Sequence, residues 1–211
     1  GITAVYDARG QLTHYVGIFS DLSERKATAD KIEFLAHHDP LTALPNRVLF
    51  YGRLEQALTQ AERQRTAVAL LVLDLDRFKL VNDSLGHELG DQLLQMVAMR
   101  LHQHVRETDT VSRQGSDEFL MLLPETGVEG ADRVVGNLLQ CFQNEPFKIA
   151  DHALNITASI GVTLYPTHGR NSDSLLKQAG IALDYAKNGG GNTYRFFTAS
   201  MNVNTLDSLL W

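Results

Sequence analysis

The chain has 211 residues, of which 44% are hydrophobic and 21% are charged, and its formal net charge is −6. These proportions are typical of a globular protein and exclude a disordered or fibrous chain. The acidic balance argues against non-specific binding to nucleic acid or to an anionic membrane, because both require clustered lysines and arginines.

The first segment of the chain predicts a hairpin followed by a helix. Residues 2–20 alternate apolar and polar side chains, which predicts β-strands over Ile2–Tyr6 and Leu12–Phe19. Two strands alone are marginally stable in water, so we expect this hairpin to belong to a larger domain. A connecting helix is predicted over Leu22–His37, and Pro40 prevents it from continuing.

The pattern from residue 39 onward predicts interleaved helices and strands. Asn46 is the expected N-cap of a helix that runs to about Arg63, and the apolar run Ala67–Leu73 predicts a strand buried on both faces. Amphipathic spacing predicts a helix over Glu88–His104. The other expected elements are a helical turn over 77–83, strands over Thr110–Arg113 and Glu118–Leu123, a helix over Val128–Gln143, a strand over Ile156–Leu164, a helix over Ser172–Lys187 and a strand over Thr193–Phe197.

Hairpins and crossovers both occur in this order of elements. The predicted fold class is therefore α+β, with a mixed, mainly antiparallel central sheet flanked by helices. The run Ala67–Leu73 is far shorter than the roughly 20 residues that a membrane-spanning helix needs. The single cysteine, Cys141, excludes an intrachain disulfide and a cysteine zinc site, and we expect it to be a buried helix thiol.

Two acidic segments are candidates for chemistry. Asp74 and Asp76 follow the buried strand, where residues i and i+2 face the same way, and the hairpin turn contains Asp117 and Glu118. Each segment alone has a structural explanation, either as a solvated strand end or as a tight turn. Together, beside one sheet, they can converge on a metal ion, and two-metal nucleotidyl transfer uses such a carboxylate cluster.

Five motifs in the same order resemble the GGDEF domain family, the diguanylate cyclases. The match covers about residues 38–198, and Ala43 replaces a glycine of the first motif. The matching segments are DPLTALPNR at 39–47, DLDRFKLVND at 74–83, GHELGD at 86–91, RQGSDEF at 113–119, and SIGV at 159–162 with AK at 186–187.

The resemblance implies a site for a divalent cation and GTP. It implies that Asp74, the carbonyl of Leu75 and Asp117 bind Mg²⁺ (or Mn²⁺), with Glu118 as a further metal ligand or as the base for the attacking hydroxyl. The implied catalytic residues are Asp74, Lys79, Asp117 and Glu118, and the implied substrate-binding residues are Phe78, Asn82, Asp91, Gly115, Ser116 and Lys187.

The nucleotide would be recognised at both of its ends. The resemblance assigns guanine to Asn82 and Asp91, because guanine offers N1–H and N2–H₂ as adjacent donors to a carboxylate. It assigns the phosphates to Lys79 and Lys187, for which a solvated surface amine is the alternative. Phe78 has the alternative role of anchoring its loop in the core.

The resemblance implies a product-binding site at Arg106 and Asp109. They form an R-x-x-D pair five residues before the signature turn, which is Gly115–Glu118. Arginine can hold the O6 and N7 atoms of guanine in a bidentate manner. A solvated surface pair is the alternative. Two departures from the family pattern bear on activity: Ser116 replaces the second glycine of the signature, and Gly191 stands in place of a phosphate-binding arginine.

The resemblance divides the chain into four parts. Residues 1–21 resemble the last hairpin of a PAS sensory domain, 22–37 form a linker helix, 38–198 the GGDEF domain, and 199–211 an exit toward an EAL phosphodiesterase domain. We therefore expect a piece of a longer PAS–GGDEF–EAL protein. A reducing compartment is favoured by the cysteine usage, so the expected location is cytoplasmic, with membrane attachment of the full-length protein left open.

Two functions of different classes follow. The first is a diguanylate cyclase that condenses two GTP to cyclic di-GMP, is inhibited by its product, binds no nucleic acid and acts as a two-fold homodimer. The second is a GTP-binding regulatory domain, without turnover, that controls a fused EAL phosphodiesterase. A purely structural dimerisation domain is a third reading.

Overall fold

The computed structural model describes residues 2–17 and 22–202, and the chain divides into two compact units, residues 1–36 and 37–211. The first unit contains strands β1 (Ile2–Tyr6) and β2 (Leu12–Gly17), paired as an antiparallel hairpin, and all of helix α1 (Leu22–His37) except its last residue. The hairpin and the helix were both predicted; the expected last strand residues Ile18 and Phe19 lie outside the described residues. No helix in the described ranges is long and apolar enough to span a membrane.

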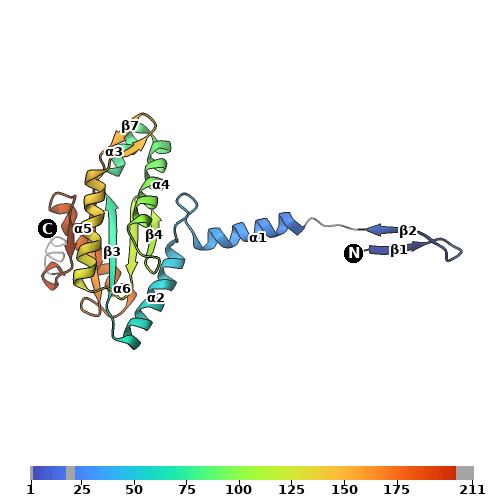
Figure 1. The fold of residues 1–211 in the computed structure, drawn as a ribbon, viewed down its shortest axis with the longest axis horizontal. Coiled ribbons are helices and arrows are strands. Elements are labelled where there is room, and N and C mark those ends of the chain that lie inside the picture. Colours follow the sequence, from blue (N-terminus) through green and yellow to red (C-terminus); the bar gives the residue numbers. More distant parts are fainter. Residues whose placement is uncertain (1, 18–21, 203–211) are drawn as a thin grey trace, which may run out of the picture. The chain divides into compact units, whose positions relative to one another are not determined.

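The second unit alternates helices and strands (Figure 1). Its helices are α2 (Arg47–Gln64), α3 (Phe78–Leu85), α4 (His87–Gln103), α5 (Val128–Asn144) and α6 (Ser172–Asn188). Its strands are β3 (Val68–Leu75), β4 (Thr110–Gly115), β5 (Glu118–Leu123), β6 (Phe147–Ile149), β7 (His152–Leu154), β8 (Ala158–Tyr165) and β9 (Tyr194–Phe196).

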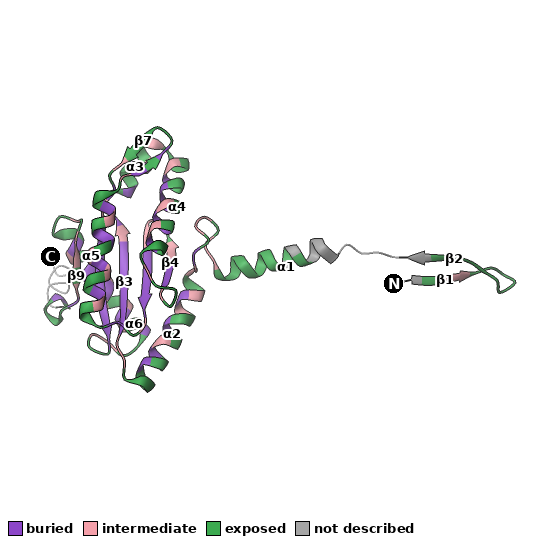
Figure 2. Ribbon diagram, in the orientation of Figure 1, coloured by how far each residue is buried: buried purple, intermediate pink, exposed green. Residues whose placement is uncertain are grey.

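One five-stranded sheet with the order β4-β5-β3-β8-β9 organises this unit. Its pairs are antiparallel except for the parallel pair of β8 and β9, so the predicted mixed, mainly antiparallel sheet is confirmed. β3 lies at the centre and is buried along nearly its whole length, as its unbroken apolar sequence predicts (Figure 2).

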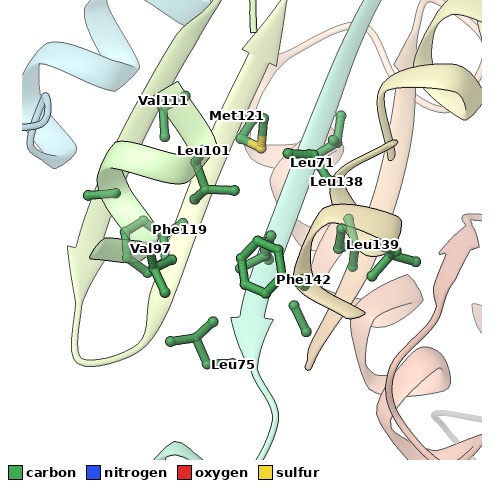
Figure 3. Packing of buried hydrophobic residues seen from close by; sticks show 14 of the residues in the cluster. Leu71, Leu75, Val97, Leu101, Val111, Phe119, Met121, Leu138, Leu139 and Phe142 are labelled. Atoms are coloured by element: carbon green, nitrogen blue, oxygen red, sulfur yellow. The ribbon is translucent and has the colours of Figure 1, made fainter. Parts of the chain in front are cut away.

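The two faces of the sheet carry separate hydrophobic cores. Leu71 and Leu75 of β3 pack with α4 and α5 (Figure 3), in the same cluster as Leu73, whereas Leu70 and Val72 pack with α2 and α6. Because alternate residues of a strand point to opposite faces, Asp74 continues the series of Leu70 and Val72 toward α2 and α6. The strand pattern thus decides on which face the acidic strand end lies.

Helix α6 lies unusually close to the sheet because of Gly161 in β8. A Cβ atom at this position would stand 2.0 Å from the carbonyl oxygen of Ala179 and 2.4 Å from the backbone nitrogen of Leu183. No side chain fits in that space, so the glycine permits a direct backbone approach. The last turn of α6, with Lys187, is consequently held next to the end of β3.

The structure corrects several sequence-based expectations. The strand predicted over Ala67–Leu73 continues to Leu75, because Asp74 is paired on both sides, and the expected helical turn at 77–83 is the two-turn helix α3. The hairpin of β6 and β7 was missed, since strands of three residues carry too little periodicity. Cys141 lies on α5 but is half-buried rather than buried.

Candidate active site

Three acidic side chains gather at one end of the sheet. In the register of the central strands, Asp74 pairs with Glu118 of β5 on one side and with Ser159 of β8 on the other. Asp117 immediately precedes Glu118 in the hairpin turn. The sheet therefore brings together the acidic strand end and the acidic hairpin, as the sequence predicted for Asp74, Asp117 and Glu118.

The surroundings of these carboxyl groups disfavour their negative charges. Burial raises the pKa of Asp74, and the charges of Asp117 and Asp76 add to this effect, while a hydrogen bond from Lys187 opposes it. Burial also raises the pKa of Glu118, with a further contribution from the charge of Asp74. Mutual repulsion of this kind is what a bound cation relieves.

Lys187 supplies a positive charge within this cluster. Its Nζ lies 2.9 Å from Oδ2 of Asp74, in an ion pair whose side chains are 40% and 17% exposed, respectively. The amine predicted to hold phosphates is thus bound to a predicted metal ligand. Lys79, the other predicted phosphate residue, is exposed in the first turn of α3.

The signature turn has a left-handed backbone. Gly115 has φ of 128° and Ser116 has φ of 43°, so the serine occupies a conformation that favours glycine. Its hydroxyl donates a hydrogen bond of 2.8 Å to Oδ1 of Asp117. Ala43, the other residue that replaces a family glycine, also has a positive φ, of 59°. Ser116 and Ala43 therefore each place a side chain where the backbone conformation favours glycine.

A partly buried ion pair fixes this turn to the first motif of the domain. Nη1 of Arg113 donates to both carboxylate oxygens of Asp39, at 2.9 and 3.1 Å. Nε and Nη2 of Arg113 donate to the carbonyl oxygen of Ser116, at 3.0 and 2.8 Å. The motif resemblance implied no role for Arg113 or Asp39, although both residues belong to the matching segments.

Asp76, which was expected to face the same site as Asp74, instead anchors the loop after α6, although its charge still acts on Asp74. Its carboxylate accepts hydrogen bonds from the hydroxyls of Thr157 and Ser159 and from the backbone N–H of Asn192. A Cβ at Gly191 would stand 3.0 Å from Oδ1 of Asp76, and Gly191 has a positive φ of 73°. This loop conformation is therefore adapted to glycine at 191, and simple reintroduction of an arginine there would strain it.

The predicted guanine residues lie on the helices that follow β3. Oδ1 of Asn82, on α3, is buried and has no hydrogen-bond partner within the described residues. A Cβ at Gly90 would stand 1.9 Å from that oxygen, so the glycine makes room for it. Asp91, the residue after Gly90 in α4, is exposed. Phe78 is buried in the core, as its alternative role of anchoring the loop would require.

A hollow of about 490 Å³ adjoins Lys187 and the loop after α6. Its lining includes Arg77, Leu80 and Val81 at the start of α3, together with Gly190 and Gly191. Arg77, Leu80 and Val81 of its lining belong to the second sequence motif, and Lys187 belongs to the last.

The predicted product site is a turn before β4. The backbone N–H of Arg106 donates to Oδ2 of Asp109 at 2.8 Å, so the aspartate side chain closes the turn. Burial raises the pKa of Asp109. The two side chains border different hollows: Asp109 lines one of about 330 Å³ against α2, and Arg106 lines another beside the start of α5.

The acidic cluster fits a metal that is delivered with a nucleotide. Within residues 2–17 and 22–202, no three carboxylate, imidazole or thiol side chains converge as a ready metal site. Asp74 and Asp117 are nevertheless close enough for the charge of one to shift the pKa of the other. Mg²⁺ is usually held by one or two carboxylates together with substrate phosphates, and this donor set matches that arrangement.

In the sheet, the acidic hairpin of β4 and β5 lies beside the acidic end of the central strand β3. Comparison with models of known families matches residues 36–193 to the family described as diguanylate cyclase, GGDEF domain. The chain belongs to this GGDEF family, which confirms the resemblance found in the sequence.

Individual relatives have different stated activities. The bifunctional diguanylate cyclase/cyclic di-GMP phosphodiesterase MucR of Pseudomonas aeruginosa is 45% identical over 83% of this chain and 25% of its own length. Diguanylate cyclase TpbB of the same species is 43% identical over 72% of this chain and 35% of its length. Cyclic di-GMP phosphodiesterase NbdA, also from this species, is 39% identical over 83% of this chain and 22% of its length. The chain therefore spans about a third or less of these relatives.

Solved structures share the fold. The GGDEF domain of TpbB has a TM-score of 0.77 and 38% identity, covering 81% of this chain and 99% of that one. The coiled coil and GGDEF domain of DgcB from Caulobacter crescentus, in complex with cyclic di-GMP, has a TM-score of 0.74 and 27% identity, covering 83% and 93%. These matches confirm the predicted fold class.

Proposed function

We propose that this domain is a diguanylate cyclase that joins two GTP molecules into cyclic di-GMP in a homodimer. The observation that carries the proposal is the pairing of Asp74 with Glu118 across the sheet, with Asp117 next to Glu118 in the chain and its charge acting on both. In each of two steps, the 3′-oxygen of one GTP bonds to the α-phosphorus of the other. The bond from that phosphorus to its bridging oxygen breaks, and pyrophosphate leaves.

Glu118 is the group that we assign to the proton of the attacking 3′-hydroxyl. Its pKa is raised by burial and by the charge of Asp74, and a raised pKa makes a carboxylate a stronger base. Asp74 and Asp117, with the Leu75 carbonyl, would hold Mg²⁺ or Mn²⁺. When bound, that ion would neutralise charge on the phosphate and lower the pKa of the hydroxyl. Asn82 and Asp91 would recognise guanine, and Lys79 and Lys187 the phosphates.

One domain offers one such site, whereas the product contains two nucleotides. Two domains must therefore face each other, which a two-fold homodimer accomplishes. We assign dimerisation to α1, whose Ile32 and Leu35 are exposed. PAS and EAL domains on either side, and a cytoplasmic location, remain part of this proposal.

Incubation of the protein with GTP and Mg²⁺, followed by chromatographic separation of nucleotides, tests the proposed activity. Cyclic di-GMP and two equivalents of pyrophosphate are expected, with a rate per protomer that rises with protein concentration. Absence of product at high protein concentration, in a protein that includes its flanking domains, would contradict the proposal.

The second candidate is a GTP-binding regulatory domain that controls a fused EAL phosphodiesterase. The positive φ of Ser116 and the glycine-adapted loop at Gly191 favour it, because both alter the nucleotide site. It predicts saturable GTP binding in calorimetry without product. In the longer protein, GTP would then stimulate hydrolysis of cyclic di-GMP.

We expect Ser116→Gly to raise the initial rate of product formation by about threefold or more. The change removes the hydroxyl that donates to Oδ1 of Asp117. It also relieves the backbone strain of a serine with a positive φ. Relief of about 1 kcal/mol of backbone strain is offset by the greater entropy of glycine in the unfolded chain, so stability should change little. Ser116→Ala, which loses only the hydroxyl, separates the two causes. Equal rates in wild type and Ser116→Gly would contradict the expectation.

For the product site, we propose that Arg106 and Asp109 bind a guanine of cyclic di-GMP. Arg106→Ala should weaken cyclic di-GMP binding about tenfold in calorimetry, because a bidentate arginine–guanine contact contributes roughly 1–3 kcal/mol. Arg133→Ala, at an exposed arginine of α5, is the matched control and should bind as wild type does. Unchanged affinity in Arg106→Ala would identify this pair as a solvated surface turn.

A further inference from the structure

The last turn of α6 places an ammonium group on one carboxylate oxygen of Asp74, a proposed metal ligand. Nζ of Lys187 and Oδ2 of Asp74 are 2.9 Å apart. An ammonium group and a divalent cation repel each other, so both cannot be bound to this oxygen. Metal binding at this oxygen, Oδ2 of Asp74, therefore requires Lys187 to leave it.

Of the two partners, Lys187 is the one that can move. Asp74 is held by strand pairing on both sides, and its side chain is only 17% exposed. Lys187 is 40% exposed and ends in a flexible four-carbon stem. Its helix is fixed by the backbone contact over Gly161, so movement of the amine needs only rotation of its side chain.

The charge of Lys187 acts on more than its direct partner. Burial and the charge of Asp117 raise the pKa of Asp74 and that of Glu118, and the positive charge of Lys187 offsets part of this rise. The ammonium thus supplies part of the charge compensation that a metal would give. A nucleoside triphosphate, with its several negative charges, would offer the amine an alternative set of oxygens, and Lys187 borders a hollow of about 490 Å³.

We propose that Lys187 couples metal binding to nucleotide binding by exchanging Asp74 for the phosphates. This inference rests on the proposed function and adds a role for Lys187 beyond phosphate contact. The metal alone competes with the amine for Asp74 and binds weakly. The nucleotide draws the amine away, and metal and nucleotide then bind cooperatively. Because such coupling is reciprocal, the metal must raise nucleotide affinity by the same factor.

Mn²⁺ titrations followed by electron paramagnetic resonance of the free ion test this coupling at pH 8. The titrations are done with and without a GTP analogue that has a methylene group between its α- and β-phosphorus atoms. Wild type should bind Mn²⁺ at least tenfold more tightly with the analogue. Lys187→Met should bind Mn²⁺ alone about tenfold more tightly than wild type, because one adjacent positive charge is gone. The enhancement by the analogue should fall by at least that factor.

Two variants identify the site of the gain. Lys177→Met removes an exposed lysine from the same helix and should behave as wild type. Asp74→Asn in the Lys187→Met background should abolish the gain. Thermal melting of every variant shows whether it is folded. If Lys187→Met is poorly folded, Lys187→Gln is used in its place.

The outcomes separate this inference from the proposed function. Nucleotide-dependent Mn²⁺ binding in wild type, with no gain in Lys187→Met or Lys187→Gln, overturns the coupling and leaves the metal site standing. A gain of equal size in Lys177→Met also overturns it, since helix charge in general would then explain the effect. No Mn²⁺ binding in wild type even with the analogue overturns both.

Discussion

Replacement of Asp117 by asparagine is expected to lower the rate of cyclic di-GMP formation about a thousandfold, equivalent to about 4 kcal/mol of transition-state stabilisation. Asp117 lies at the tip of the signature turn, where its charge acts on both Asp74 and Glu118. Asparagine keeps the shape but removes the negative charge that we assign to the metal. The rate is measured by separation of nucleotides at saturating GTP and Mg²⁺.

The fold of Asp117→Asn should remain intact, which distinguishes loss of chemistry from loss of structure. The carboxylate of Asp117 has like-charged neighbours, so its neutralisation should leave the melting temperature equal or slightly higher. Asp151→Asn makes the same change at an exposed residue in the turn between β6 and β7, and should retain full activity. More than a tenth of wild-type activity in Asp117→Asn would contradict the assigned metal role.

The sequence was sufficient to predict the sheet and the meeting of its acidic residues. An unbroken apolar strand has to be central, and alternation along it sends Asp74 to the face of α2 and α6. The capping role of Asn46 was predicted as well, and its side chain accepts the backbone N–H of Leu49. These features depend on local chemistry or on a strand period of two, and both can be read directly from a sequence.

Other parts of the site depend on contacts between residues far apart in the chain. Asp76 repeats the acidic pattern of Asp74 but is bound by Thr157, Ser159 and the backbone of Asn192, which no local pattern predicts. The close approach of α6 over Gly161 is likewise visible only in three dimensions. The short hairpin of β6 and β7 was missed for a different reason, because it is too brief to show a period.

Loss of the arginine that links Asp39 to the signature turn is expected to destabilise the domain by about 3 kcal/mol. Side chains of the Arg113–Asp39 pair are only 10% and 13% exposed. Removal of one partner of a buried pair leaves the other charge uncompensated, which typically costs about 3–5 kcal/mol. Arg113→Met also leaves the Ser116 carbonyl without its two guanidinium donors. Arg133→Met, at an exposed arginine, should stay within about 0.5 kcal/mol of wild type.

The pH dependence of stability identifies the ion pair as the source of this loss. Burial acts to raise the pKa of Asp39, but hydrogen bonds from Thr42 and Arg113 outweigh it and hold the pKa below its ordinary value of 3.8. A depressed carboxyl pKa stabilises the folded state above the unfolded value and loses that effect as pH falls through the folded one. In urea titrations, the difference between wild type and Arg113→Met should therefore be constant above about pH 5 and shrink below pH 3.8. A difference that persists undiminished as Asp39 becomes protonated would show that packing of the arginine stem, and not its charge, holds the turn in place.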